Sequence, residues 1–473
     1  MPELPEHEVA ARPLKLAPQA ERSSKGKSEA IMTTSIQDLR EKVARQKDAL
    51  AVMYGHIDFD RRPERFTDDA DAETHMRSEL LDQRPRLLAN TELIARIEAF
   101  TMLGDAVADA YAALLPDYGF RRLVDMLTEA CDNGIGSVDG APPELIAMIK
   151  DMERVPDWLD MTLVEEGARQ ERKVFTHVAP YAIRGGFVGT FMNTYAALPM
   201  ALTGALNKND AARRIKETSA FFTATILPGA LRRDGAGFKA AAKVRLMHSM
   251  VRFNVLRRGK WDSEVYGVPI PQSDQMPAGL LVVFRLSMQI LASGRDHFTP
   301  GERAHVEFSR YRCFLLGLPE DLLPDSPRAI VDILATRHAT LRKAYDDATC
   351  GELLRATMAA YLEPDNSVRS RIRDRFERSF SKAFFIRSYL GGNNERARQI
   401  GIGLNAGDRV RTAAVAAMLA AQVAAYRAIA ALPFARHAAD AMLVRKLNKI
   451  LSRLGHAEFT TDAAKYQPVH DVG

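Results

Sequence analysis

With 473 residues, the chain is long enough to bury a large hydrophobic core in two or three structural units. Apolar residues make up 47% and charged residues 26%, as in an ordinary globular protein. Lys and Arg exceed Asp and Glu by only 65 to 60, so the charge does not predict nucleic-acid binding. Cys131, Cys313 and Cys350 are too widely spaced for a disulfide framework, a Cys-x-x-Cys pair or covalent c-type haem attachment.

The N-terminal region differs in composition from the rest. Residues 1–30 are rich in Pro, Glu, Lys and Ser, which predicts disorder, and they contain no apolar stretch typical of a secretory signal. We therefore expect a cytoplasmic protein, with peripheral membrane association left open. Residues 33–54 predict one amphipathic helix with Ser35 as its N-cap, and residues 56–75 a polar loop.

From Thr91 onward, apolar residues recur with helical spacing, and no alternating runs with hairpin turns separate them. We therefore predict an all-α fold. A helix pair is predicted over 91–118, followed by a helix over 120–131 and a helix that begins at the prolines 142–143 and ends before residue 155. The further predicted helices are 163–180, 186–206, 210–226, 236–257, 277–293, 299–316, 327–346, 351–362, 367–388, 409–431 and 435–454.

Two apolar segments raise the question of a membrane span. Residues 185–207 carry no charge and are about long enough to cross a bilayer, but Asn193 and Pro199 favour a buried central helix. The Ala-rich segment 412–435 is predicted to be a core helix as well, with contact to a membrane surface or a partner as the alternative.

Glu302 and His305 have the Glu-x-x-His spacing of di-iron bundles, but such a site needs a second pair that the chain lacks. Thr299, Pro300 and Glu302 instead predict a helix N-terminus with a capping box. We therefore predict a structural role for this segment.

His248 lies on the apolar face of the predicted helix 236–257, in the segment VRLMHSMVR. Arg245 precedes it by three positions and Arg252 follows by four, so both neighbour it on the helix surface. A buried imidazole needs partners for both ring nitrogens. Spacing alone leaves two possibilities open, a satisfied core histidine and a metal ligand.

A second polar group occurs on helix 210–226, in the segment NDAARRIKETSAFF. Arg214 and Thr218 are four positions apart and share a face, with Glu217 beside them. A cation, a hydroxyl and a carboxylate suit the polar side of a pocket. The alternative is a solvated face on which Glu217 pairs with Arg213 or Arg214.

Taken in order, several segments resemble one family. They are PPELIAMIKDMERVPDWLD, MNTYAALP, RRIKETSAFF, VRLMHSMVR and YGVPIPQSDQ. Over residues 90–325 the chain resembles the rubber oxygenases (latex clearing proteins), which share a catalytic domain with the endoplasmic-reticulum-bound oxygenase of mycophenolic acid biosynthesis.

The resemblance implies a b-type haem in a globin-like helical core, with His248 as the proximal iron ligand. It also implies that Arg214 and Thr218 lie on the distal side of the haem. From helix geometry we add Arg245 and Arg252 as candidates for contacts with the haem propionates. A carbonyl or a carboxylate is expected to accept from the second nitrogen of His248.

Two departures from the family pattern bear on the chemistry. Glu217 stands where some rubber oxygenases have a lysine that can approach the iron, and no acidic residue occurs between Arg184 and Asp210 to match their distal glutamate. Glu217 is therefore the candidate base. Rubber itself is a doubtful substrate, because a polymer is met outside the cell and the chain shows no secretion signal.

We accordingly predict a haem b-dependent oxygenase that uses dioxygen on an apolar, isoprenoid-like small molecule. The family's chemistry is cleavage of a carbon–carbon double bond, and the sequence leaves hydroxylation open as the reaction. The alternatives are a peroxidase-like haem enzyme, a haem-binding or sensing protein without turnover, and a helical scaffold without haem. His177 is the fallback ligand. The predicted organisation is an N-terminal extension (1–85), a catalytic core (86–325) and a C-terminal helical extension (326–473) packed on the core.

Overall fold

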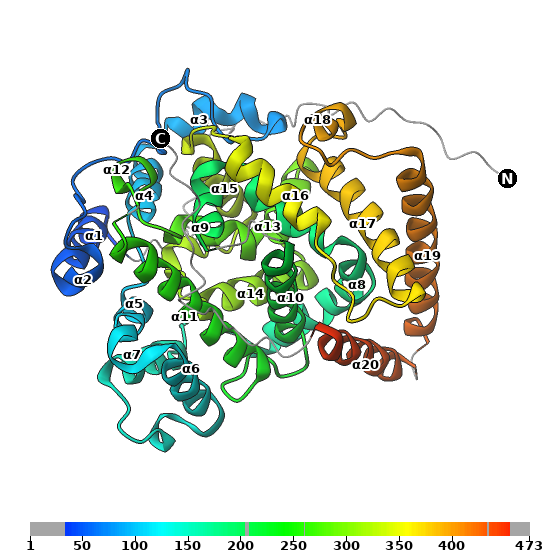
Figure 1. Cartoon of the computed structure of the whole chain (residues 1–473), viewed down its shortest axis with the longest axis horizontal. Coiled ribbons are helices and arrows are strands. Elements are labelled where there is room, and N and C mark those ends of the chain that lie inside the picture. Colours follow the sequence, from blue (N-terminus) through cyan, green and yellow to red (C-terminus); the bar gives the residue numbers. More distant parts are fainter. Residues whose placement is uncertain (1–33, 204–207, 260, 433–434, 455–473) are drawn as a thin grey trace.

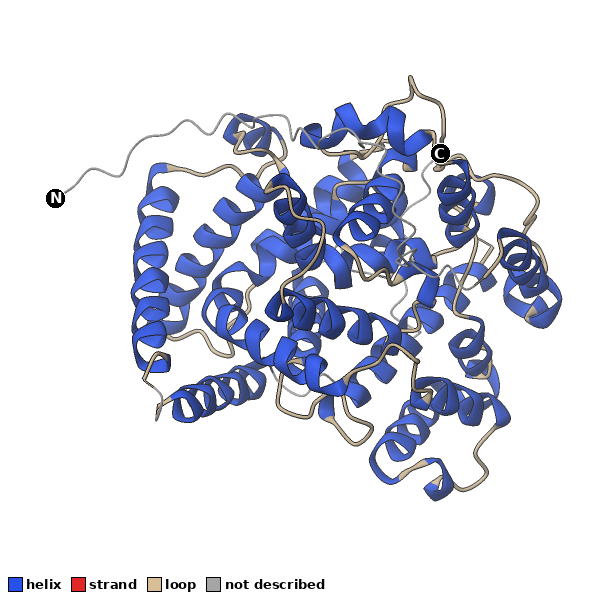
Figure 2. Cartoon of the chain, turned by 180° about the vertical axis from the view of Figure 1, so that it is seen from behind, coloured by secondary structure: helices blue, strands red, loops and turns tan. Residues whose placement is uncertain are grey.

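The structure is a computed structural model that describes residues 34–203, 208–259, 261–432 and 435–454. These residues fold mainly into helices and form no β-strand beyond two isolated bridges, Phe66 with Leu341 and Thr74 with Arg342. The predicted all-α fold is therefore confirmed, as Figure 2 shows. The predicted disorder of residues 1–30 concerns a segment outside the described residues.

The largest hydrophobic core is built mostly by helices from the first two thirds of the chain (Figure 1). The helices up to the candidate site are α1 Ile36–Ala49, α2 Ala51–Tyr54, α3 Arg84–Leu88, α4 Thr91–Thr101, α5 Ala106–Ala112, α6 Leu115–Asn133, α7 Pro143–Glu153, α8 Met161–Phe187, α9 Thr194–Leu202, α10 Lys208–Thr225 and α11 Ala236–Arg257.

The remaining helices complete this core and then pass to the other side of α8. They are α12 Ser263–Tyr266, α13 Gln272–Ala292, α14 Pro300–Leu315, α15 Pro327–Thr340, α16 Glu352–Ala359, α17 Val368–Tyr389, α18 Asn394–Gln399, α19 Ala406–Ala430 and α20 Arg436–Leu454. Helix α8 packs against α14 and also against α17, so it joins the core to the C-terminal helices (Figure 1).

Several predicted helix starts are confirmed at the level of hydrogen bonds. The Ser35 hydroxyl accepts from the Asp38 backbone N–H at 3.1 Å. Thr299 and Glu302 form the predicted capping box, in which the Glu302 carboxylate accepts from the Thr299 N–H at 2.8 Å. Helix α11 has the predicted bounds, 236–257.

The predicted helix 186–206 is wrong, because polar capping divides it. A 3₁₀ turn, Val188–Phe191, follows α8, and the Asn193 side chain then accepts from the Tyr195 N–H at 3.0 Å to begin α9. The predicted helix 327–346 ends at Thr340, where the chain extends to form the bridges to the loop before α3. The helix predicted over 33–54 is divided at Leu50.

Helix α19 contradicts the prediction of a core helix in the Ala-rich segment. It lies at the edge of the molecule (Figure 1), and its buried residues are only Asp408, Val415, Leu419 and Tyr426. Among the described helices it alone is long and apolar enough to cross a membrane by length and composition. Its contacts with α17, α20 and α8 are made by one side of the helix.

A buried arginine ties α8 to the C-terminal helices. The guanidinium of Arg184 is fully buried and contacts the carboxylates of Glu377 at 2.7 Å and Asp374 at 3.4 Å. It also donates to three backbone carbonyls near the end of α16, those of Thr357, Met358 and Ala360. One side chain therefore neutralises two buried acids and pairs three buried carbonyls.

We predict that Arg184→Ala lowers the free energy of unfolding by about 3–5 kcal/mol, because it leaves the Glu377 carboxylate buried without its cation, whereas Asp374 keeps its pair with Arg378 at 2.6 Å. Arg45→Ala removes an exposed pair with Glu41 and serves as the control, with an expected loss below about 1 kcal/mol. Urea unfolding followed by circular dichroism measures both. Equal losses in the two variants would contradict the assigned role of Arg184.

Candidate active site

His248 is a partly buried histidine on α11 with one engaged ring nitrogen. Its Nδ1 atom lies 3.1 Å from Oε1 of Gln275 on α13, and this is the hydrogen bond that the ring forms with the described residues. Burial lowers the pKa of the imidazole to about 4, against the small opposing effect of Gln275. The ring is therefore neutral at pH 7, with the Nε2 lone pair available if Nδ1 carries the proton.

The partner of the second nitrogen is thus a side-chain amide, where the sequence predicted a carbonyl or a carboxylate. Gln275 lies within the segment YGVPIPQSDQ that carries part of the family resemblance. Nothing in the spacing singled it out, because it is 27 positions from His248 and on another helix.

Arg245 is buried beside His248 on α11 and is fully engaged by acids. Its Nε and Nη2 atoms contact the two carboxylate oxygens of Asp105 at 2.6 and 2.9 Å, and its Nη1 atom contacts Asp151 at 2.7 Å. Burial alone would raise the pKa of Asp105, but the charge and hydrogen bonds of Arg245 outweigh it and the pKa is lowered. The bidentate geometry makes this a strong pair.

Arg252, seven positions after Arg245 on α11, forms a second buried ion pair. Its guanidinium contacts Asp109 at 2.9 Å, and Asp109 also accepts from the Tyr54 hydroxyl at 2.5 Å. Its Nη1 atom donates to the carbonyls of Pro269 and Ile270, at 3.1 and 2.7 Å. Ile270 has a φ of 48°, an unfavourable value for a β-branched residue, so these bonds hold a strained turn directly before α13.

Both arginines therefore attach α11 to the segment 105–109, and Arg252 also attaches it to the turn before α13. Their predicted contact with haem propionates receives no support from these contacts and stays a prediction. The acids that engage them, Asp105 and Asp109, were not identified from the sequence. They are about 140 positions away from the arginines, and no local pattern indicates the pairing.

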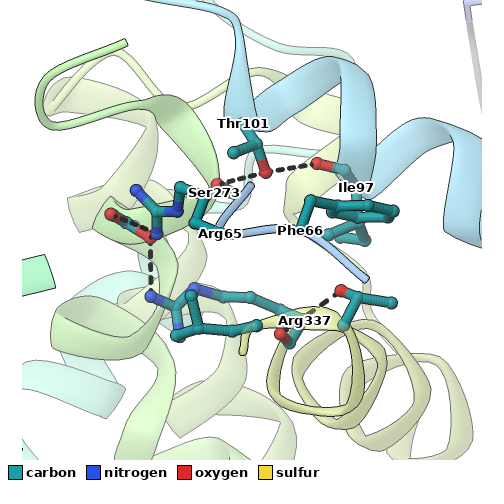
Figure 3. A pocket seen from close by; sticks show the side chains of 9 residues that line it. Arg65, Phe66, Ile97, Thr101, Ser273 and Arg337 are labelled. Atoms are coloured by element: carbon teal, nitrogen blue, oxygen red, sulfur yellow. Dashed lines mark hydrogen bonds and ion pairs between the residues drawn. The ribbon is translucent and has the colours of Figure 1, made fainter. Parts of the chain in front are cut away.

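The first turn of α13, which carries Gln275, is held from two sides. The Asp274 carboxylate accepts from Arg65 at 2.8 Å and from Arg337 on α15 at 2.6 Å. Figure 3 shows Arg65 and Arg337 reaching one carboxylate from opposite directions, beside a cavity of about 10 Å³ that Thr101 also lines. A cavity of that size holds about one water molecule, so this pocket is a packing feature.

The predicted polar group on α10 faces a different environment. Helix α10 packs side by side with α11 (Figure 1), and Arg214, Glu217 and Thr218 are all partly buried. The Nη2 atom of Arg214 donates to the Thr203 carbonyl at the end of α9, at 2.8 Å. The structure therefore brings the helix with these residues against the helix with His248. Within the described residues, it shows no hydrogen bond from any of the three to His248.

Glu217 is a partly buried carboxyl whose pKa is raised by burial. Arg213 pairs with Asp210 at 3.2 Å, and Glu217 forms no ion pair or hydrogen bond with any described residue. The predicted alternative, pairing of Glu217 with Arg213 or Arg214, is thus not observed. Burial raises the pKa of Glu217 to about 7, although the charges of Arg213 and Arg214 lower it. A carboxyl with such a pKa suits proton transfer at neutral pH.

The other histidines considered have different surroundings. The Nδ1 atom of His177, on α8, lies 3.3 Å from Gln422 on α19 and 3.4 Å from Lys446 on α20, and its Nε2 atom is buried without a partner in the described structure.

Glu302, of the Glu-x-x-His segment, is engaged by the capping box and by Arg295. No group of three or more potential metal-binding side chains occurs in the part of the chain that the structure describes.

Comparison with known proteins is consistent with these features. Residues 172–438, more than half of the chain, match the family described as ER-bound oxygenase mpaB/B'/Rubber oxygenase, catalytic domain. The match begins within α8 and ends in α20, so it extends beyond residue 325, where the sequence predicted the core to end. No curated protein sequence matches the chain.

One solved structure, described as "Structure of Latex Clearing Protein LCP in the closed state", resembles this fold. The TM-score is 0.50 with 18% sequence identity, over 75% of this chain and 91% of that chain. At that identity the likeness concerns the fold alone, which is all-α in both.

We predict that the Glu217 carboxyl titrates with a midpoint near pH 7, because burial favours its protonated form. Infrared difference spectra between pH 5 and pH 9 should show loss of a protonated-carboxyl band with that midpoint, and the band should be absent in Glu217→Gln. Because the folded pKa exceeds the ordinary value of 4.5, this group's contribution to stability falls as pH rises from about 4.5 to 7. A midpoint near 4.5 would contradict the assignment.

Proposed function

Because the chain belongs to the family of mpaB-type and rubber oxygenase catalytic domains, an oxygenase family, we propose that it is a haem b-dependent oxygenase with His248 as the axial ligand of the iron. The observation that carries this proposal is the state of His248. It combines a neutral ring, an Nδ1 atom held by Gln275 and an Nε2 atom that forms no hydrogen bond with a described residue.

These features fit the requirements of a haem ligand. Iron binds the lone pair of a neutral imidazole nitrogen, and the other ring nitrogen is normally hydrogen-bonded to fix the ring. His177 fits less well, because its Nδ1 atom faces the ammonium of Lys446 as well as Gln422 and its Nε2 atom is enclosed by the packing. A bound haem supplies the redox centre for oxygen chemistry.

The chain's own residues would bind, orient and exchange protons around that centre. The guanidinium of Arg214 and the hydroxyl of Thr218 would give the distal side hydrogen-bond donors. Glu217, with a pKa near 7, would accept a proton from the substrate and return it during one reaction cycle. Arg245 and Arg252 would have a structural role, because their ion pairs with Asp105 and Asp109 hold α11 in place.

We further propose an apolar substrate with a carbon–carbon double bond, of isoprenoid type, whose cleavage follows the family's chemistry. Apolar side chains beside the polar group support this, since Phe221 and Phe222 follow Thr218 on α10 and Val244 and Met247 precede His248 on α11. A cytoplasmic location remains part of the proposal.

The visible spectrum of the haem-reconstituted protein tests the axial ligand. We expect a Soret band in the parent, its loss or displacement in His248→Ala, and its retention in His177→Ala, because His248 lies on α11, which packs against α10, whereas Nδ1 of His177 faces Gln422 and Lys446. A colourless parent would contradict the haem proposal. Loss of the band in His177→Ala alone would indicate that His177 on α8 is the axial ligand and would contradict the assignment to His248.

Glu217→Gln tests the base. We predict that kcat for oxygenation of an isoprenoid alkene falls by about 10²–10⁴-fold with unchanged haem content. In the parent, activity should rise with pH through about 7, since the base must be ionised. Asp210→Asn is the matched control. It removes a negative charge that raises the pKa of Glu217, so the midpoint should fall while the plateau rate persists. An unchanged kcat in Glu217→Gln would contradict this role.

A further inference from the structure

We propose that Gln275 is a positioning residue that fixes the tautomer of His248 and, as a neutral acceptor, holds the reduction potential of the bound iron above the value that a carboxylate partner would give. This inference rests on the proposed function and concerns the same site. It is carried by the polarity of a chain of buried hydrogen bonds that runs from His248 to the backbone of Gly104.

The chain of hydrogen bonds has one possible direction. A backbone carbonyl can only accept, so the Gln272 side chain must direct its Nε2 group toward the Gly104 oxygen, at 3.1 Å. Its Oε1 atom then accepts from Nε2 of Gln275 at 3.0 Å. This leaves Oε1 of Gln275 to face Nδ1 of His248 at 3.1 Å. Because that oxygen can only accept, the proton of His248 resides on Nδ1 and the lone pair on Nε2.

The backbone end of this chain cannot move easily. The Gly104 N–H donates to Oε1 of Gln46 at 2.8 Å, and Nε2 of Gln46 donates to the Met102 carbonyl at 3.0 Å. A Cβ atom at Gly104 would lie 2.1 Å from the Tyr54 hydroxyl and 2.7 Å from the Asp109 carboxylate, so no larger residue fits there. The segment around Gly104 therefore lies against both the hydrogen-bonded amides of Gln272 and Gln275 and the buried ion pairs of α11.

The amides are themselves enclosed. Gln272 is 2% exposed and Gln275 is 7% exposed, and the Gln272 N–H donates to the Leu103 carbonyl at 2.9 Å. Asp274, between them in sequence, is held by Arg65 and Arg337. Rotation of either amide would place two oxygens or two N–H groups face to face in a buried site, which is unfavourable.

The Gln275 oxygen that accepts from His248 carries no formal charge, and this would affect the reduction potential of a bound iron. A carboxylate beside Nδ1–H draws the proton away from the ring, which makes Nε2 a stronger electron donor and stabilises the oxidised iron. A neutral amide has a smaller effect. Asp105 and Asp109, near the Gly104 end of this chain, are neutralised by Arg245 and Arg252, and Asp274 is neutralised by Arg65 and Arg337. With a haem bound at His248, these surroundings would favour the reduced form of the iron.

Gln275→Glu in the full-length, haem-reconstituted protein tests the effect on the iron. We expect a lower reduction potential by spectroelectrochemistry and a higher iron–histidine stretching frequency by resonance Raman spectroscopy. Gln275→Leu, which removes the acceptor, should lower that frequency. Gln289→Glu, an exposed position on the same helix, adds the same charge and should change neither. A parent-like potential and frequency in both Gln275 variants would overturn the inference.

The tautomer is tested without haem, which separates this inference from the proposed function. In ¹⁵N NMR spectra of the haem-free protein, His248, assigned by comparison with His248→Ala, should show the Nδ1–H tautomer, and Gln275→Leu should lose that preference. The Nε2–H tautomer in the parent would overturn the inference even if haem binds. Correct tautomer with no haem binding would overturn the proposed function and the predicted effect on potential, and would leave the fixed tautomer established.

Discussion

The structure depends on the neutralisation of positive charge inside α11. Arg245 and Arg252 are 3% and 0% exposed, and each would be costly to bury alone. Asp105 and Asp109 pair with them from the start of α5, and Tyr54 adds a hydrogen bond to Asp109. These pairs determine where α11 lies along the segment 102–109, and they do so with directional, bidentate contacts that apolar packing lacks.

The candidate site centres on His248, a residue of α11 that takes no part in these ion pairs. Arg245 and Arg252 pair with acids at α5, whereas His248 has one nitrogen bound to α13 and the other without a hydrogen bond to any described residue. Gly104 connects the two halves, because it contacts the Asp109–Arg252 pair and also accepts the last bond of the amide chain. A change in either network would therefore alter the orientation of His248.

The sequence predicted the parts of this arrangement that are local. Helical periodicity predicted α11 with its observed bounds, and the capping residues Ser35 and Thr299 were identified because a cap is a pattern of three or four neighbouring residues. The break before α9 was missed, because Asn193 looked like a polar residue in an apolar run and its capping role depends on a bond to the distant Arg342 carbonyl. Gln275 and Asp105 were missed because their partners are far away in sequence.

The proposal that most needs a direct test is that His248 binds the iron through Nε2 while Gln275 holds Nδ1. A crystal structure of the haem-reconstituted protein, with an anomalous difference map recorded at the iron absorption edge, measures this directly. We expect a single iron peak at bonding distance from Nε2 of His248, with the Gln275 oxygen still in contact with Nδ1. An iron peak at His177, or at His248 with Nδ1 as the ligand, would contradict it.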